Sequence, residues 1–85
     1  MAQPSVRLTL YLRSYCHLCL DFLERLRRWP GSQGWHIDIH DIDDDPEMAA
    51  RYNDLIPLLT DGDGNEICRF FFDDVALTAY LAKIR

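Results

Sequence analysis

The feature that most constrains the fold of this chain is a pair of cysteines, Cys16 and Cys19, separated by two residues. Residues 6–12, just before the pair, alternate between apolar and polar side chains, and this pattern predicts a β-strand. From Cys16 onward the apolar residues recur at helical spacing, up to the helix stop at Pro30-Gly31. The sequence therefore predicts a strand-loop-helix unit with both cysteines at the N-terminus of the helix.

This position favours thiol chemistry. A cysteine is a nucleophile only as a thiolate, and the free N–H groups and the dipole at a helix N-terminus stabilise that anion. Cys16 has this position, with Ser14 close enough to act as the N-cap residue. Cys19 follows almost one helical turn later, so the two sulfur atoms can form or break a disulfide. Arg13 and His17 flank Cys16 as candidate thiolate-stabilising groups, and the always charged guanidinium is the stronger of the two.

The residues thus predict thiol–disulfide exchange, in which Cys16 attacks a substrate disulfide and Cys19 resolves the mixed disulfide. The third cysteine, Cys68, lies in a predicted strand, where a single cysteine usually packs as a small apolar residue. An odd number of cysteines fits a reducing compartment better than a secreted disulfide scaffold. We therefore expect a cytoplasmic protein.

The rest of the chain continues the alternation of strands and helices. Five elements are expected after the first helix: a strand over residues 35–40, a short helix capped by Asp44 with Glu47 as its capping-box partner, a strand from Ile56 to Leu59, a strand over residues 66–70, and a helix capped by Asp73 or Asp74 whose apolar face holds Val75, Leu77, Tyr80, Leu81 and Ile84. The turn signal over residues 61–65 predicts a hairpin between the third and fourth strands. The order β-α-β-α-β-β-α predicts an α/β fold with a four-stranded mixed sheet and three helices in a single domain, residues 1–85.

Composition excludes several classes of partner. A formal net charge of -5 leaves no basic surface for nucleic acid and disfavours acidic membrane surfaces. No run of 18 apolar residues is present, so the sequence predicts no membrane span. We expect a soluble monomer that acts on a disulfide-containing protein or a small thiol.

Two motifs of the chain together resemble the glutaredoxins: Cys16-His17-Leu18-Cys19 after the first strand and Ile56-Pro57 before the third. The acidic run over residues 41–46 and the pair Arg51-Tyr52 are similar, more closely, to a group of small, mostly uncharacterised bacterial glutaredoxin-like proteins. The resemblance extends over roughly the whole chain and implies a thioredoxin-like fold of the glutaredoxin type.

The resemblance also implies roles for matching residues near the thiols. The first cysteine of the motif is the exposed nucleophile and the second the more buried resolving group, which assigns these roles to Cys16 and Cys19. The basic residue three positions before the nucleophile, here Arg13, helps to stabilise the thiolate.

On the substrate side, the resemblance implies that Pro57 is cis and faces the cysteine pair. The backbone of Ile56 would pair with an incoming peptide or with glutathione as an added strand does. Tyr15 and Asp74 are expected to take part in substrate binding.

Glutathione is implied only as a reductant or co-substrate, and no bound cofactor is predicted. The glutathione-binding members of the family resemble one another in a Gly-Gly pair, and Phe70-Phe71 stand in its place here. Two rings where hydrogens are expected add bulk near the groove, which points against a specific glutathione site. In that case Asp73 and Asp74 act only as helix caps.

Three alternatives to a redox enzyme follow from the same residues. The fold can serve as a non-catalytic adaptor that holds a peptide in the groove of Cys16 and Pro57. A zinc site of Cys16, Cys19 and one histidine is a weaker alternative because no second ligand pair appears, and our prediction for metals is none. The cysteines can also simply pack at the helix start.

Overall fold

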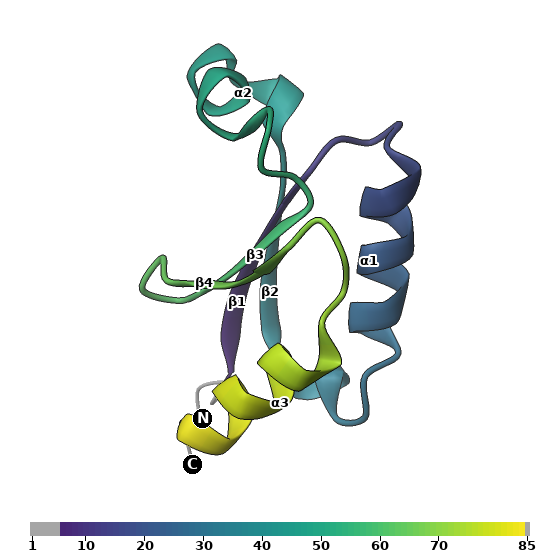
Figure 1. Cartoon of the computed structure of the whole chain (residues 1–85), viewed down its shortest axis with the longest axis vertical. Coiled ribbons are helices and arrows are strands. Elements are labelled where there is room, and N and C mark those ends of the chain that lie inside the picture. The colour runs from purple at the N-terminus through teal and green to yellow at the C-terminus, as the bar shows by residue number, and fades with distance from the viewer. Residues whose placement is uncertain (1–5, 85) are drawn as a thin grey trace.

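A four-stranded mixed sheet carries three α-helices in the computed structural model, which describes residues 6–84 (Figure 1). In chain order the elements are β1 (Arg7–Leu12), α1 (His17–Arg27), the 3-10 turn η1 (Ser32–Gly34), β2 (His36–Asp41), the 3-10 turn η2 (Ile42–Asp44), α2 (Pro46–Tyr52), β3 (Leu58–Asp61), β4 (Glu66–Arg69) and α3 (Asp74–Lys83). The predicted order β-α-β-α-β-β-α is confirmed. The predicted domain limits, residues 1 and 85, lie outside the described residues.

The strands lie in the order β2-β1-β3-β4. β1 runs parallel to β2 and antiparallel to β3, and β3 and β4 form the predicted antiparallel hairpin. The parallel register places Leu12 beside Asp41, so the C-terminal ends of β1 and β2 lie at the same end of the sheet. The cysteine pair follows β1 at this end.

The core lies between one face of the sheet and the helices α1 and α3, which cover that face together (Figure 1). The alternation of β1 sends every second residue inward, as predicted. The buried apolar residues of this cluster are Val6, Leu8, Leu10, Leu12, Cys19, Phe22, Leu26, Leu59, Cys68 and Leu77. Cys68 therefore packs in the core. None of the helices within residues 6–84 has the length and apolar character to cross a membrane.

The apolar face of α3 is narrower than predicted. Leu77 is fully buried, whereas Val75 is 76% exposed and Ile84 is 41% exposed. Val75 precedes Leu77 by two residues, which is about 200° around a helix, so the two side chains cannot share a face. Ile84 follows the last helical residue and lies beyond the packed face.

Helix α2 lies at the end of the sheet and buries none of its residues (Figure 1). Its Tyr52 stacks on Tyr11 of β1 with ring centroids 4.1 Å apart, and Tyr11 points to the face opposite the main core. Helix α2 is therefore attached to the sheet through a small, half-exposed aromatic contact.

Two helix caps follow the expected chemistry, one of them at a different residue. Asp73 caps α3 as predicted, and its carboxylate accepts a hydrogen bond from the N–H of Ala76 at 3.0 Å. The prediction that Asp44 caps α2 is wrong. Asp45 has this role and accepts from the N–H of Glu47 at 3.0 Å, because the following proline occupies the first helical position.

Candidate active site

Cys16 is the N-cap residue of α1. Its backbone is extended, and its Sγ accepts a hydrogen bond from the N–H of Cys19 at 3.2 Å. The prediction that Ser14 caps the helix is wrong, because the chain makes a further turn before α1 begins at His17. The N–H of Cys16 donates to the carbonyl of Arg13 at 3.1 Å, which closes that turn. A backbone donor thus points directly at the sulfur of Cys16.

The two thiols differ sharply in exposure. Cys16 is half-buried, whereas Cys19 is 0% exposed and belongs to the core cluster. Burial raises the pKa of the Cys19 thiol to about 12, and its hydrogen bond with the Cys16 side chain adds to the shift. Cys19 therefore keeps its proton at neutral pH, and of the two cysteines only Cys16 is partly exposed at the surface.

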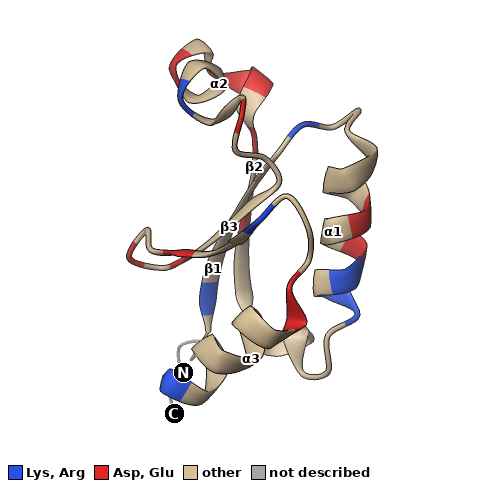
Figure 2. Cartoon of the chain, in the orientation of Figure 1, with Lys and Arg blue, Asp and Glu red and all other residues tan. Residues whose placement is uncertain are grey.

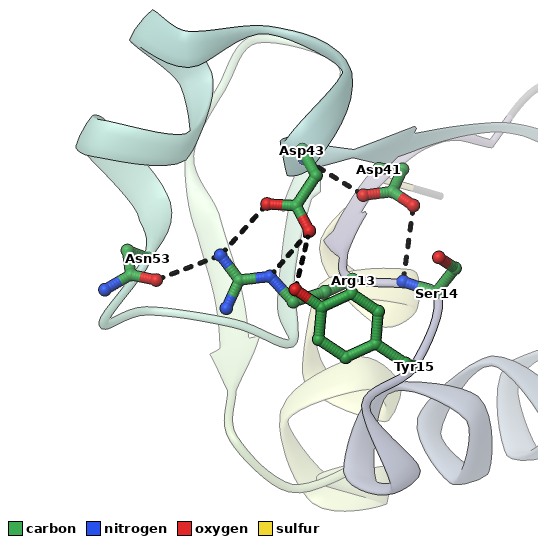
Figure 3. Close-up of polar contacts among 6 residues, drawn as sticks. All are labelled: Arg13, Ser14, Tyr15, Asp41, Asp43 and Asn53. Atoms are coloured by element: carbon green, nitrogen blue, oxygen red, sulfur yellow. Dashed lines mark hydrogen bonds and ion pairs between the residues drawn. The ribbon is translucent and has the colours of Figure 1, made fainter.

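Arg13 is held by two acceptors from other elements (Figure 3). Its Nε and Nη2 donate to the two carboxylate oxygens of Asp43 at 2.9 and 3.1 Å, and Nη2 also donates to the side-chain oxygen of Asn53 at 3.0 Å. This bidentate ion pair with Asp43 fixes the orientation of the guanidinium and neutralises its charge. Arg13, predicted to stabilise the Cys16 thiolate, is thus directed toward η2 and the end of α2.

The residues after Arg13 are tied to the same turn. The Tyr15 hydroxyl donates to Asp43 at 3.0 Å, which raises the pKa of Tyr15, and the N–H of Ser14 donates to Asp41 at 3.3 Å (Figure 3). Asp41 in turn accepts from the N–H of Asp43 at 3.0 Å. We call this set of contacts among Arg13, Ser14, Tyr15, Asp41, Asp43 and Asn53 the loop clamp. It fixes the segment that leads into Cys16.

Sequence reasoning missed the partners in the loop clamp, although the signal was present. Parallel pairing brings the ends of β1 and β2 together, so the acidic residues after β2 must lie beside Arg13 after β1. The acidic run predicts a helix cap at Asp44 and contributes to the family resemblance, but neither interpretation pairs it with Arg13. Asn53, at the far end of α2, had no comparable signal.

The Ile56–Pro57 peptide bond is cis, as predicted. Pro57 is buried, and its carbonyl accepts a hydrogen bond from the N–H of Phe70 at 2.7 Å. The N–H and carbonyl of Ile56 form no hydrogen bond with any residue in the described range 6–84. The backbone donor and acceptor of Ile56 are thus unpaired within these residues.

Phe70 has a backbone angle rarely seen outside glycine. Its φ is 71°, and the N–H of Phe71 donates to the carbonyl of Arg69 at 2.8 Å across it. A bulky residue in the left-handed region is strained. Phe70 therefore has a conformation that glycine adopts more readily, at a position where the resemblance to glutathione-binding glutaredoxins implies glycine.

His17 and Asp74 stand apart from these contacts. His17 is the exposed first residue of α1, and Asp74 is the exposed first residue of α3, beside the N-cap. Neither side chain forms a hydrogen bond within residues 6–84. No group of three or more His, Cys, Asp or Glu side chains able to hold a metal occurs in this part of the chain, so the three ligands of the alternative zinc site do not come together.

Comparison with known proteins places this geometry in a family. The profile of the family described as glutaredoxin-like domain (DUF836) matches residues 7–82. The chain belongs to this glutaredoxin-like family. No curated protein matches the chain.

Solved structures agree with this assignment. Target protein XcR50 from X. campestris is 34% identical, with a TM-score of 0.72 over 89% of this chain and 96% of that one. Protein Ne2328 from Nitrosomonas europaea is 28% identical, with a TM-score of 0.74 over 94% of each chain. Fasciola hepatica thioredoxin is 17% identical, with a TM-score of 0.62 over 98% of this chain and 84% of that one, which supports the fold alone. The protein thus has a glutaredoxin-like version of the thioredoxin fold, with Cys16 and Cys19 close together.

Proposed function

We propose that this glutaredoxin-like protein is a thiol–disulfide oxidoreductase in which Cys16 is the nucleophile and Cys19 the resolving thiol. The observation that carries the proposal is the asymmetry of the pair. Cys16 is partly accessible and has a backbone N–H directed at its sulfur, whereas Cys19 is fully buried directly behind it. A hydrogen-bond donor at the sulfur stabilises the negative charge of the attacking thiolate.

The reaction has two exchange steps. The Cys16 thiolate attacks one sulfur of a substrate disulfide, so a Cys16–substrate disulfide forms, the substrate S–S bond breaks and one substrate thiolate leaves. Cys19 then loses its proton to the departed thiolate or to solvent and attacks Cys16. The Cys16–Cys19 disulfide forms and the second substrate thiol is released. The substrate disulfide gains two electrons and the protein dithiol loses them, so a reducing thiol or dithiol must regenerate the protein.

The substrate we propose is a disulfide-containing protein or a small disulfide. The unpaired backbone groups of Ile56 support binding of an extended chain, as do Tyr15, which is 74% exposed, and the strained Phe70 beside Pro57. Glutathione remains a candidate reductant or co-substrate. The ring of Phe70 argues against a dedicated site for it.

The test is turnover of a small disulfide by the reduced protein, regenerated with a dithiol. Cys16→Ser should abolish the protein-dependent rate. Cys68→Ala is the matched control, because Cys68 is a core thiol on β4 outside the pair, and this variant should retain the rate. Full activity in Cys16→Ser would show that the proposed mechanism is wrong.

A second candidate function is a non-catalytic module that holds a peptide or partner in the groove of Cys16 and Pro57. Phe71 favours it, because this residue is 69% exposed and an exposed aromatic side chain offers apolar surface to a partner. This function predicts that a Cys16–Cys19 disulfide, once formed, is not cycled by thiol reductants. Reversible oxidation of the pair in a thiol–disulfide buffer would exclude it.

A further inference from the structure

Arg13, the cation closest to the dithiol in the sequence, is already paired with acceptors of this chain. Arg13 is the one formally charged residue in the segment from 13 to 19. Three hydrogen bonds commit its guanidinium to Asp43 and Asn53, and only 22% of its side chain remains exposed. A guanidinium whose Nε and Nη2 already donate to Asp43 cannot use the same two donors to bind a substrate carboxylate.

The loop clamp also carries excess negative charge. Arg13 contributes one positive charge, and Asp41 and Asp43 contribute one negative charge each, which leaves one negative charge in formal terms. The titratable groups that the segment itself contributes, Tyr15, Cys16, His17 and Cys19, are neutral in the formal count at pH 7. Figure 2 shows further acidic residues along the neighbouring η2 and the start of α2.

We propose that Asp43 is a specificity-determining residue: by occupying Arg13 it makes the dithiol site reject disulfides that carry a carboxylate near the sulfur and accept neutral or cationic ones. The inference rests on the proposed function and names the substrate class of the same site. Without Asp43, Arg13 would be a free cation on the segment that ends at Cys16.

The physical basis is the charge that a substrate meets as it approaches Cys16. A carboxylate meets the unpaired charge of the clamp and gains no ion pair, whereas an ammonium group is attracted. Replacing Asp43 by asparagine removes one negative charge and turns the bidentate ion pair with Arg13 into at most one neutral hydrogen bond, and both changes favour an anionic substrate. The amide has the size of the carboxylate and can still accept a hydrogen bond, so the turn is kept.

The experiment is a single turnover of the reduced protein with three symmetric disulfides: dithiodiglycolate, which is anionic, hydroxyethyl disulfide, which is neutral, and cystamine, which is cationic. Each reaction converts one protein dithiol and one disulfide into a protein disulfide and two small thiols, so no reductant is needed. Acid-quenched samples are followed by mass spectrometry. Dividing each rate by that of free dithiothreitol with the same disulfide removes the intrinsic reactivity of the disulfide.

For the wild-type protein, the normalised rate should fall in the order cationic, neutral, anionic. In Asp43→Asn the ratio of the anionic to the neutral rate should rise on the order of tenfold at low salt, and added salt should reduce this gain. Asp44→Asn is the matched control. This substitution removes the same charge from η2, but the Asp44 side chain makes no hydrogen bond to residues 13–15. Its ratio should change by less than about twofold.

The outcomes separate the two claims. A wild-type protein that reacts with the disulfides but prefers the anionic one would overturn the inference, and so would an unchanged ratio in a folded Asp43→Asn. In both cases the proposed function stands. A wild-type protein that reacts with none of the three would overturn the proposed function, and the inference with it. The wild-type preference tests the inference even where the variant does not fold.

Discussion

Phe70 is the residue whose local conformation conflicts most with its chemical type. In the left-handed region a Cβ atom costs about 1–2 kcal/mol, and glycine avoids this cost. We therefore expect Phe70→Gly to be more stable than Phe70→Ala by about 1 kcal/mol, since both variants lose the same ring. Urea unfolding followed by circular dichroism measures the difference.

Phe71 provides the control for this prediction. Its backbone does not have a positive φ, so glycine should show its usual disadvantage there. We expect Phe71→Gly to be less stable than Phe71→Ala by about 0.5 kcal/mol. If glycine and alanine ranked in the same order at both positions, the strain assigned to Phe70 would be absent.

Cys19 should make the stability of the reduced protein depend on alkaline pH. Its pKa is raised from 9.0 to about 12 in the folded state, so the folded protein retains the proton where the unfolded chain loses it. The resulting stabilisation is complete below pH 9 and is lost as the pH rises from 9 to 12. In this window the free energy of unfolding should fall by up to about 1.4 kcal/mol per pH unit.

Cys19→Ala supplies the reference for this measurement, because the other alkaline groups are retained. The wild-type curve should fall more steeply than that of the variant within the window named above. Parallel curves would mean that the buried thiol does not titrate as described.

At the scale of the residue, the sequence predicted which residues are reactive better than it predicted which residues contact them. Cys16 and Cys19 were identified from spacing and from their place at a helix start, both of which are local properties. The partners of Arg13 depend on which strand lies beside β1, which is a property of the sheet. The residue type of Arg13 suggested a thiolate partner, whereas the topology supplies Asp43.

At the scale of the element, α3 depends on its N-cap. Asp73 satisfies the N–H of Ala76, and α3 buries only Leu77 completely, so little packing compensates for the loss of the cap. We expect Asp73→Ala to lower the free energy of unfolding by about 1 kcal/mol. Thermal unfolding followed by circular dichroism would record this as a drop in the midpoint.

Two variants test whether capping is the cause. Asp73→Ser keeps a side-chain acceptor and should retain most of the stability. Asp74→Ala, which removes a charge but no cap, should cost only about 0.3 kcal/mol. An equal loss in all three variants would point to charge or packing in place of the cap.

The periodicity of apolar residues predicted which strands and helices form, but it predicted less well at which residue each helix begins. The strands and helices were predicted because their apolar spacing is local. The caps of α1 and α2 were each misplaced, since several adjacent residues could cap and the choice depends on how the chain turns out of the preceding strand. Val75 was misassigned because apolar character alone does not fix which face a helix presents.

At the scale of the whole molecule, the fold makes two similar thiols unequal. The N-terminus of α1 lies at the end of the sheet where β1 and β2 finish, so Cys16 is partly exposed. Cys19, three residues further on, points into the core beneath α1. The acidic turn that binds Arg13 lies at the same end of the sheet. The proposed nucleophile, the proposed resolving thiol and the acidic partner of Arg13 therefore all lie on one βαβ unit and the turn that follows it.

The most direct test of this account is to identify the thiol that reacts first. The reduced Cys19→Ser variant is mixed with hydroxyethyl disulfide, and the adduct is located by peptide mass spectrometry without reductant. We predict a stable mixed disulfide on Cys16, absent from Cys16→Ser and resolved to the Cys16–Cys19 disulfide in the wild type. An adduct on Cys68, or an equal yield of adduct on Cys19 in the Cys16→Ser variant, would contradict the account.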